Sequence, residues 1–396
     1  CRKTEQQPIR RSKRLSRRDK FGDKLSSSET SEVEGENDDE QPLIQLYEMA
    51  PIIVRRKKIY KERQVAHDKI SKLFSNVDNE RAEDCQNKSY DYSQMELFYE
   101  NVLKLTPDRL IYMYIHPNPN LIAVIGCDRT GASGLLVKSD ELELWHKTSY
   151  LLHTDYCDCI RFDRLNSNLF CTSSRDCTFR MYDIFKNTTT EVLRMPEDNN
   201  ITFFDYTLDN TYLAILRHGD AILIDRRANP VVVNRYNLSK YHLRTIHVNP
   251  TQPNEFCVAG GMEKFIKVFD LRQLVERTTS PYIYRLSTNY GPHAAYYSHS
   301  GTHIMATMSH HHLASLTNSC AIPTSHEQMF LIGSTKQSQI QINAIDVDCN
   351  VLSSLKGAYL KSLCSINIAH ATQPIVVGEN SSGTIHVFTK KIEQFY

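Results

Sequence analysis

The stretch between Tyr241 and Gln273 constrains the fold more than any other part of the chain. It contains three short runs of strand-forming residues: Leu243–Val248, Glu255–Ala259 and Phe265–Asp270. Asn249-Pro250 separates the first two runs, because proline cannot continue a strand ladder, and Gly260-Gly261 turns the chain before the third. Three strands joined by a proline turn and a glycine turn, the last ending in an aromatic-Asp pair, are the layout of one propeller blade of about 40–45 residues.

The same layout recurs along the chain. Asp183, Asp225 and Asp270 each end a third strand, at spacings of 42 and 45 residues. Residues 105–390 number 286, which is about seven such units. Since one blade cannot bury its own faces, the sequence predicts an all-β, seven-bladed propeller.

Two irregularities qualify this prediction. Only 70 residues separate Ser300 from the matching turn near His370, where two repeats need about 84–90. The shortage falls around Cys320–His326, so the sixth blade is expected to be incomplete. The last repeat stops at Phe388, eight residues from the end, and an open ring would expose a sheet edge. We therefore expect Met95–Leu105 to supply the outer strand of the blade formed by Ser362–Ile368, Ile375–Gly378 and Thr384–Phe388.

The N-terminal part differs in composition from the repeats. Residues 1–24 hold ten Lys or Arg, many of them between Arg10 and Lys20, and residues 25–40 hold seven acids and no base. Such blocks cannot form a core, so residues 1–90 are expected to be largely disordered and residues 91–396 to form the propeller. The basic run is typical of a nuclear-import signal or a nucleic-acid patch, or of a solvated tail. A basic helix is expected around residues 53–75, and the sequence leaves open whether it packs on the propeller, contacts nucleic acid or docks a partner.

Composition sets limits on the class of protein. The net charge is +1, so the electrostatic field of the whole protein does not attract nucleic acid, and local basic patches would have to do so. The eleven cysteines are interpreted as mostly buried free thiols in a reducing compartment, five of them in predicted strands: Cys157, Cys159, Cys171, Cys257 and Cys364. No apolar run approaches the length of a membrane span, so no membrane partner is predicted. A fragment is expected because residue 1 is Cys.

Neither an enzyme nor a metal site is predicted. His153, Ser173 and Asp176 could suggest a hydrolase, but no nucleophile turn surrounds the serine, and buried polar groups that bond one another explain the set better. Six histidines lie between His293 and His312, mostly in predicted turns or on alternating strand faces, so they are not expected to converge on one ion. The sequence therefore predicts no cofactor and no small-molecule substrate.

Several motifs resemble a known family. LRTIHVNP, LIDRR and the closing SLCSINIAH…GENSSGTIHVF are similar to those of the WD repeat-containing protein 76 family, relatives of the damage-specific DNA-binding protein 2. The resemblance covers about residues 105–390. It implies a seven-bladed WD-repeat propeller in the nucleus that binds DNA, including damaged or modified DNA, associates with chromatin proteins, and docks as a substrate receptor on the cullin-4 ubiquitin-ligase adaptor.

The resemblance also indicates two sets of site residues. Asp225 with Arg227, and Asp270 with Arg272, fit the family's adaptor-docking pattern in consecutive blades; alternatively each arginine pairs only with its own blade's aspartate. Candidate DNA-binding residues lie in loops that lead into first strands: Arg109, Lys240, His242 and Arg244. His242 stands where the family often has lysine, which would weaken phosphate contact at neutral pH. These could also be solvated loop charges.

The shortage in repeat six falls where the damage-binding relative carries a hairpin that enters the duplex. Binding through phosphates is therefore expected to give affinity without strong sequence readout. The competing interpretation is a propeller that binds proteins or peptides without contacting DNA, and steep salt dependence would distinguish the two.

Overall fold

The computed structural model describes residues 60–75 and 91–390, except for 119, 140–143, 208–209, 229–230, 261, 277, 289, 309–321, 324–328, 337–338, 347 and 371–372. The Arg10–Lys20 run and His310 to His312 lie outside the described residues. Within the described part, no helix is long and apolar enough to cross a membrane. The predicted boundary at residue 90 stays a prediction, because the residues on its N-terminal side are described only from 60 to 75.

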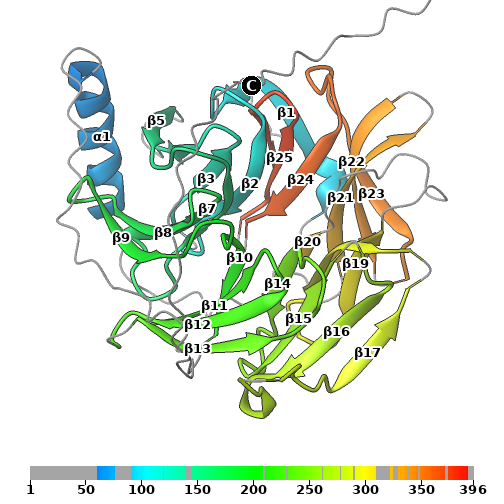
Figure 1. Ribbon diagram of the computed structural model, residues 1–396. Coiled ribbons are helices and arrows are strands. Elements are labelled where there is room, and N and C mark those ends of the chain that lie inside the picture. Colours follow the sequence, from blue (N-terminus) through cyan, green and yellow to red (C-terminus); the bar gives the residue numbers. More distant parts are fainter. Residues whose placement is uncertain are drawn as a thin grey trace, which may run out of the picture. The chain divides into compact units, whose positions relative to one another are not determined.

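The described part of the chain is an all-β propeller whose sheets follow one another in sequence order (Figure 1). Three four-stranded antiparallel sheets come first. Their strands are β2 (Leu110–Ile115), β3 (Ala123–Asp128), β4 (Ala132–Lys138) and β5 (Trp145–Leu151); β6 (Cys157–Phe162), β7 (Leu169–Ser174), β8 (Thr178–Asp183) and β9 (Thr188–Arg194); and β10 (Ile201–Tyr206), β11 (Thr211–Leu216), β12 (Asp220–Asp225) and β13 (Val232–Asn237).

Four further sheets complete the described propeller. They are β14 (Thr245–Val248), β15 (Glu255–Ala259), β16 (Phe265–Asp270) and β17 (Tyr284–Ser287); the pair β18 (Pro292–Tyr297) and β19 (Ile304–Met308); β20 (Ile322–Pro323), β21 (Met329–Lys336), β22 (Gln339–Asp346) and β23 (Val351–Leu355); and β24 (Cys364–Ala369), β25 (Ile375–Asn380), β26 (Thr384–Lys390) and β1 (Met95–Lys104). Short 3₁₀ turns precede β1, at Tyr92–Gln94, and follow β16, at Leu271–Gln273.

The closure of the last blade is confirmed. β1 pairs antiparallel with β26, with Met95 opposite Lys390 and Lys104 opposite Thr384. The N-terminal strand thus covers the sheet edge that the C-terminal repeat would leave open, as the missing fourth strand predicts. In Figure 1 the cyan β1 lies beside the red strands of this blade.

The predicted strand bounds are close to those observed, but the blade count is not. β15 and β16 have the predicted bounds, and β14 begins two residues later than predicted, at Thr245. Within the described residues, six sheets have four strands and one has two, so this part of the chain has six four-stranded blades, and the predicted count of seven blades is wrong for it. The shortage was assigned to the sixth repeat. There, however, the two-residue strand Ile322–Pro323 pairs with β21 as an inner strand, and the sheet with two described strands is the preceding one, β18–β19.

Apolar strand faces pack against neighbouring blades to form the core. A large cluster of buried side chains runs from β2 to β18 and continues in β24 to β26. The expected basic helix exists as α1 (Tyr60–Ser75). It packs on β5, and Ile70 and Phe74 are fully buried in the main cluster. The Phe74 ring meets the His116 ring edge-on, with 5.5 Å between centroids. Of the three roles left open for this helix, packing on the propeller is therefore observed.

The five strand cysteines are buried free thiols, as predicted. Burial raises the pKa of the Cys171 thiol to about 12, so this group is protonated and acts as a small apolar side chain.

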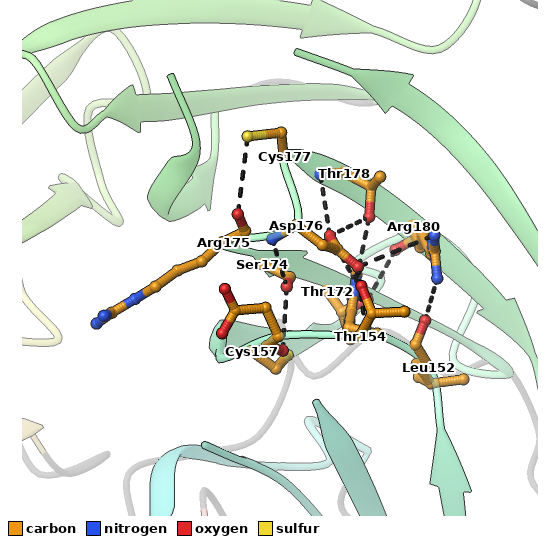
Figure 2. Close-up of polar contacts among 12 residues, drawn as sticks. Leu152, Thr154, Cys157, Thr172, Ser174, Arg175, Asp176, Cys177, Thr178 and Arg180 are labelled. Atoms are coloured by element: carbon orange, nitrogen blue, oxygen red, sulfur yellow. Dashed lines mark hydrogen bonds and ion pairs between the residues drawn. The ribbon is translucent and has the colours of Figure 1, made fainter. Parts of the chain in front are cut away.

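The polar network of the second blade differs from the prediction by one residue. His153 Nδ1 lies 3.1 Å from an Asp176 carboxylate oxygen, and His153 Nε2 lies 2.8 Å from Thr172 Oγ1. Figure 2 shows Asp176 held by Thr178, whose hydroxyl donates to it at 2.6 Å. Ser173 Oγ is buried without a hydrogen-bond partner among the described residues. Side chains alternate along a strand, so Thr172 faces the histidine while Ser173 points to the other side of β7.

Candidate nucleic-acid interface

A cavity of about 770 Å³ lies where the inner strands of several blades converge. Its walls come from the first strands of several blades, from the loops that lead into these strands, and from turns between second and third strands. Both kinds of loop lie at the same rim, because the strands of each blade are antiparallel. The residues that line it include Arg109, Tyr112, Asp158, Arg175, Asn200, Phe203, Arg217, His218, Lys240, His242, Arg244, His293, Tyr296 and Ser365.

All four predicted DNA-binding residues line this one cavity. Arg109 stands immediately before β2, and Lys240, His242 and Arg244 lie between β13 and β14. Their convergence does not by itself test DNA binding, so the assignment stays a prediction. It does place Arg109 beside residues more than 130 positions away in the sequence.

Sequence reasoning missed two further cations in the same cavity. Arg175 lies in the turn between β7 and β8, and Arg217 in the turn between β11 and β12. They occupy equivalent turns of neighbouring blades. That shared repeat position is the signal in the sequence that could have revealed them, whereas the predicted DNA-binding residues all lie in loops before first strands.

Asp158 is the carboxylate among the residues lining this cavity. Arg175 Nε donates to it at 3.2 Å, and Asn200 Nδ2 donates at 3.4 Å. Burial raises the pKa of Asp158 to about 6, although the neighbouring guanidinium opposes the shift. Arg175 also lies over the Tyr156 ring, 4.2 Å from its centroid, so both its charge and its plane are held in place.

His242 and His293 are neutral hydrogen-bonding groups near pH 7. His242 Nδ1 donates to the Arg217 carbonyl oxygen at 3.0 Å. Its pKa is lowered, first by burial, although the bond to that carbonyl opposes the shift, and further by the charges of Arg244, Arg217 and Arg175. Burial and the contacting Arg244 likewise lower the pKa of His293. The expectation that His242 carries little positive charge at neutral pH is consistent with this environment.

The floor of the cavity rests on buried aromatic rings and a buried ion pair. Tyr112 and Phe203 meet edge-on, with 5.0 Å between centroids. Beneath them Arg161 Nη1 donates to Asp205 Oδ1 at 2.6 Å, with both side chains less than a tenth exposed. The Arg161 guanidinium also lies against the face of the Phe203 ring, 5.5 Å from its centroid. This pair ties β6 to β10 and fixes the rings that form the floor.

An acid lies behind one wall. Ser365 lines the cavity and its hydroxyl donates to Glu379 Oε1. Glu379 is fully buried, and its Oε2 has no hydrogen-bond partner in the described part of the chain. Burial raises the pKa of Glu379 to about 8, while Ser365 and Arg109 oppose the shift. The group is therefore largely a neutral acid at pH 7.

The predicted docking residues lie away from the cavity, where third strands end. Arg227 forms a two-point ion pair with Asp225 at 2.9 and 3.0 Å, and Arg272 forms one with Asp270 at 2.6 and 2.9 Å. Each arginine thus pairs with its own blade, yet the side chains are 64% and 71% exposed. The neighbouring Arg226 instead turns inward, with Nη1 3.0 Å from Asp163. The docking assignment stays a prediction.

No group of three His, Cys, Asp or Glu in the described residues is arranged to hold a metal ion. His293 contacts Arg244, and His303 Nδ1 lies 2.9 Å from the Thr302 hydroxyl. His293 and His303 therefore act in separate local contacts.

Comparison with known proteins reveals related propellers. No family model matches the sequence. WD repeat-containing protein 76 of Mus musculus is 26% identical over 356 residues, covering 82% of this chain and 55% of the relative, and that of Xenopus laevis is 26% identical over 325 residues, covering 74% and 55%. DNA damage-binding protein CMR1 of Kluyveromyces lactis is 24% identical over 201 residues, covering 48% of this chain and 39% of the relative.

The chain spans about half the length of the curated relatives it matches. The similarity to WD repeat-containing protein 76 extends over about three quarters of the chain or more. Together with the sheet order, it shows that the chain is similar to WD repeat-containing protein 76, as its motifs indicate.

Proposed function

We propose that this chain is a DNA-binding WD-repeat scaffold of the DNA damage response, acting in the nucleus on chromatin. The observation that carries the proposal is the convergence of Arg109, Arg175, Arg217, Lys240 and Arg244 on one cavity. Cationic side chains on one rim are the footprint of phosphate binding. The printed name of the CMR1 relatives, DNA damage-binding protein, supports the same ligand.

The cations act on the DNA backbone. Guanidinium groups bind phosphate oxygens through paired N–H donors, and a duplex is too large to enter a cavity of about 770 Å³. The duplex therefore lies across the mouth, with phosphates against the rim. Since base edges are then not read, affinity depends on charge and discriminates weakly among sequences.

Binding of a fluorescent duplex, measured by anisotropy at several salt concentrations, tests this. Each phosphate contact contributes about 0.9 to the slope of log affinity against log salt. Arg109→Glu with Lys240→Glu should flatten that slope by about two units, whereas Arg235→Glu, on the outer strand β13, should leave it unchanged. An affinity that barely changes with salt would reject DNA binding and favour the protein-binding alternative. Strong preference for a lesion or a modified cytosine would contradict backbone recognition.

We also propose that the opposite rim docks the cullin-4 ligase adaptor through Arg227 and Arg272. Each guanidinium is more than three-fifths exposed, and the aspartate beside it holds its plane for paired hydrogen bonds to carboxylates or carbonyls. Arg227→Ala with Arg272→Ala should abolish co-purification of the adaptor with little change in the thermal melt, because exposed substitutions usually alter stability by about 0.5 kcal/mol or less. Undiminished co-purification would rule out this docking mode.

We also propose that the propeller has a seventh blade and that the protein acts as a scaffold and not as an enzyme. We assign β18–β19 as the inner half of a blade between β14–β17 and β20–β23, since β18 packs on β14 and β15.

The basic run Arg10–Lys20, outside the described residues, is the proposed nuclear-import signal.

A further inference from the structure

The cavity contains more positive charge than a duplex lying across its mouth would use. Five cationic side chains line it against the single carboxylate of Asp158. That carboxylate is committed to Arg175. Across the described residues, no carboxylate lies within ion-pair distance of Arg109, Arg217, Lys240 or Arg244. Within the described residues, these four cations therefore surround one concave space without forming an ion pair, and the buried Glu379 on which Arg109 acts is largely neutral at pH 7.

Several of these cations act on the same histidine of the cavity. Arg175, Arg217 and Arg244 come from three different blades, and all three act electrostatically on the ring of His242. Arg244 contacts His293 on the opposite side, and Arg217 is tied through its carbonyl to His242. Like charges around one cavity repel one another, and a polyanion bound among them would offset this repulsion.

We propose that the cavity is a binding site for a compact polyphosphate, a small molecule that bears several phosphate groups. Its volume of about 770 Å³ lies within the 300–1,000 Å³ typical of small-ligand sites. A strand end would bring too few phosphates into this space to match four uncompensated cations. A compact molecule with several phosphates matches them, and Asn200 and Ser365 add hydrogen-bonding groups on the walls.

This inference goes beyond DNA binding and makes a regulatory consequence testable. Arg109 and Lys240 would serve both ligands, so a bound polyphosphate would compete with a duplex at the rim. The sequence predicts no small-molecule ligand, because cations in separate repeats show no common site until the ring closes.

Calorimetry and thermal melts with inositol hexakisphosphate as the probe test the proposal on the whole chain. Saturating probe should raise the melting temperature, because a ligand that binds the folded state stabilises it. Arg217→Ala with Lys240→Ala should weaken binding about 100- to 10,000-fold, from the loss of two charge-assisted contacts. The matched control, Lys186→Ala with Arg285→Ala, removes two exposed cations elsewhere and should bind as the unsubstituted chain does.

Three further arms distinguish the sources of phosphate. Inorganic phosphate at equal total phosphate should not reproduce the effect, and a nucleoside triphosphate should bind more weakly than the probe. A 5′-phosphorylated single strand should compete too weakly to displace the probe at equal concentration. The proposal is overturned if the cavity variant and the control weaken equally, if inorganic phosphate is as effective as the probe, or if the single strand displaces it. Duplex binding without probe binding would refute this inference alone, and probe binding without duplex binding would refute the proposed function alone.

Discussion

Glu379→Gln should stabilise the propeller at alkaline pH and have little effect in acid. Glu379 is fully buried behind the cavity wall, with the Ser365 hydroxyl on Oε1. Its pKa is about 8 in the folded chain, against an ordinary value of 4.5. Because the folded pKa lies above the unfolded one, stability is fully present below pH 4.5 and is lost as the pH rises toward 8.

The size of the effect follows from the difference in pKa. Each unit corresponds to about 1.36 kcal/mol, so between pH 5 and pH 8 the protein with Glu379 should lose about 3–4 kcal/mol relative to the Gln variant. For a propeller of this size we expect about 2 °C per kcal/mol, at the low end of the usual range, or about 6–8 °C in melting temperature. Glutamine retains an acceptor for Ser365 and offers N–H donors where the neutral acid offers O–H.

The assay compares thermal melts of both proteins at pH 5 and pH 8, with exposed Glu100→Gln as the control. The difference in melting temperature should be near zero at pH 5 and should increase steadily to pH 8. A difference that does not change with pH, or a Gln variant that is less stable at pH 8, would refute the account of a buried neutral acid.

Two further predictions concern the interior. Asp205→Ala leaves Arg161 buried without its 2.6 Å partner and should lower the free energy of unfolding, measured by urea denaturation, by about 3–5 kcal/mol. A second change, Arg161→Met, should recover part of this loss. A loss under about 1 kcal/mol would show that the pair is not isolated from water. Burial lowers the pKa values of His116 and His247 to about 4. Their contribution to the free energy of unfolding is therefore fully present above pH 6.5 and should fall between pH 6.5 and 4 by up to about 3 kcal/mol for each. His116→Asn should flatten the dependence of the melting temperature on pH over this interval, and an unchanged slope would contradict the account of buried neutral histidines.

Local sequence determined the strands and how the ring closes. The bounds of β15 and β16 follow from two runs of strand-forming residues, which Asn249-Pro250 separates from the run before them and Gly260-Gly261 separates from each other. The pairing of β1 with β26 follows from a missing fourth strand, since an open edge is unfavourable wherever it occurs. The rim position of Arg109 and Lys240 follows as well, because every loop before a first strand lies at the same end of its blade.

Other features depend on contacts between blades, which a repeat pattern does not encode. Arg226 turns inward to Asp163 while Arg227 remains exposed, and the choice depends on a carboxylate in the preceding blade. In the described residues the sixth repeat has an inner strand, Ile322–Pro323, whose register against β21 is set by pairing, and the sheet with two described strands is β18–β19.

The cavity itself is decided only by tertiary structure. Arg175 and Arg217 lie in turns that look like ordinary solvated loops, and they become part of one site because closing the ring brings the turns of separate blades around a common space. Periodicity along the chain specifies which residues face the rim. The distances among them, and hence the uncompensated charge, arise from packing between strands far apart in the sequence.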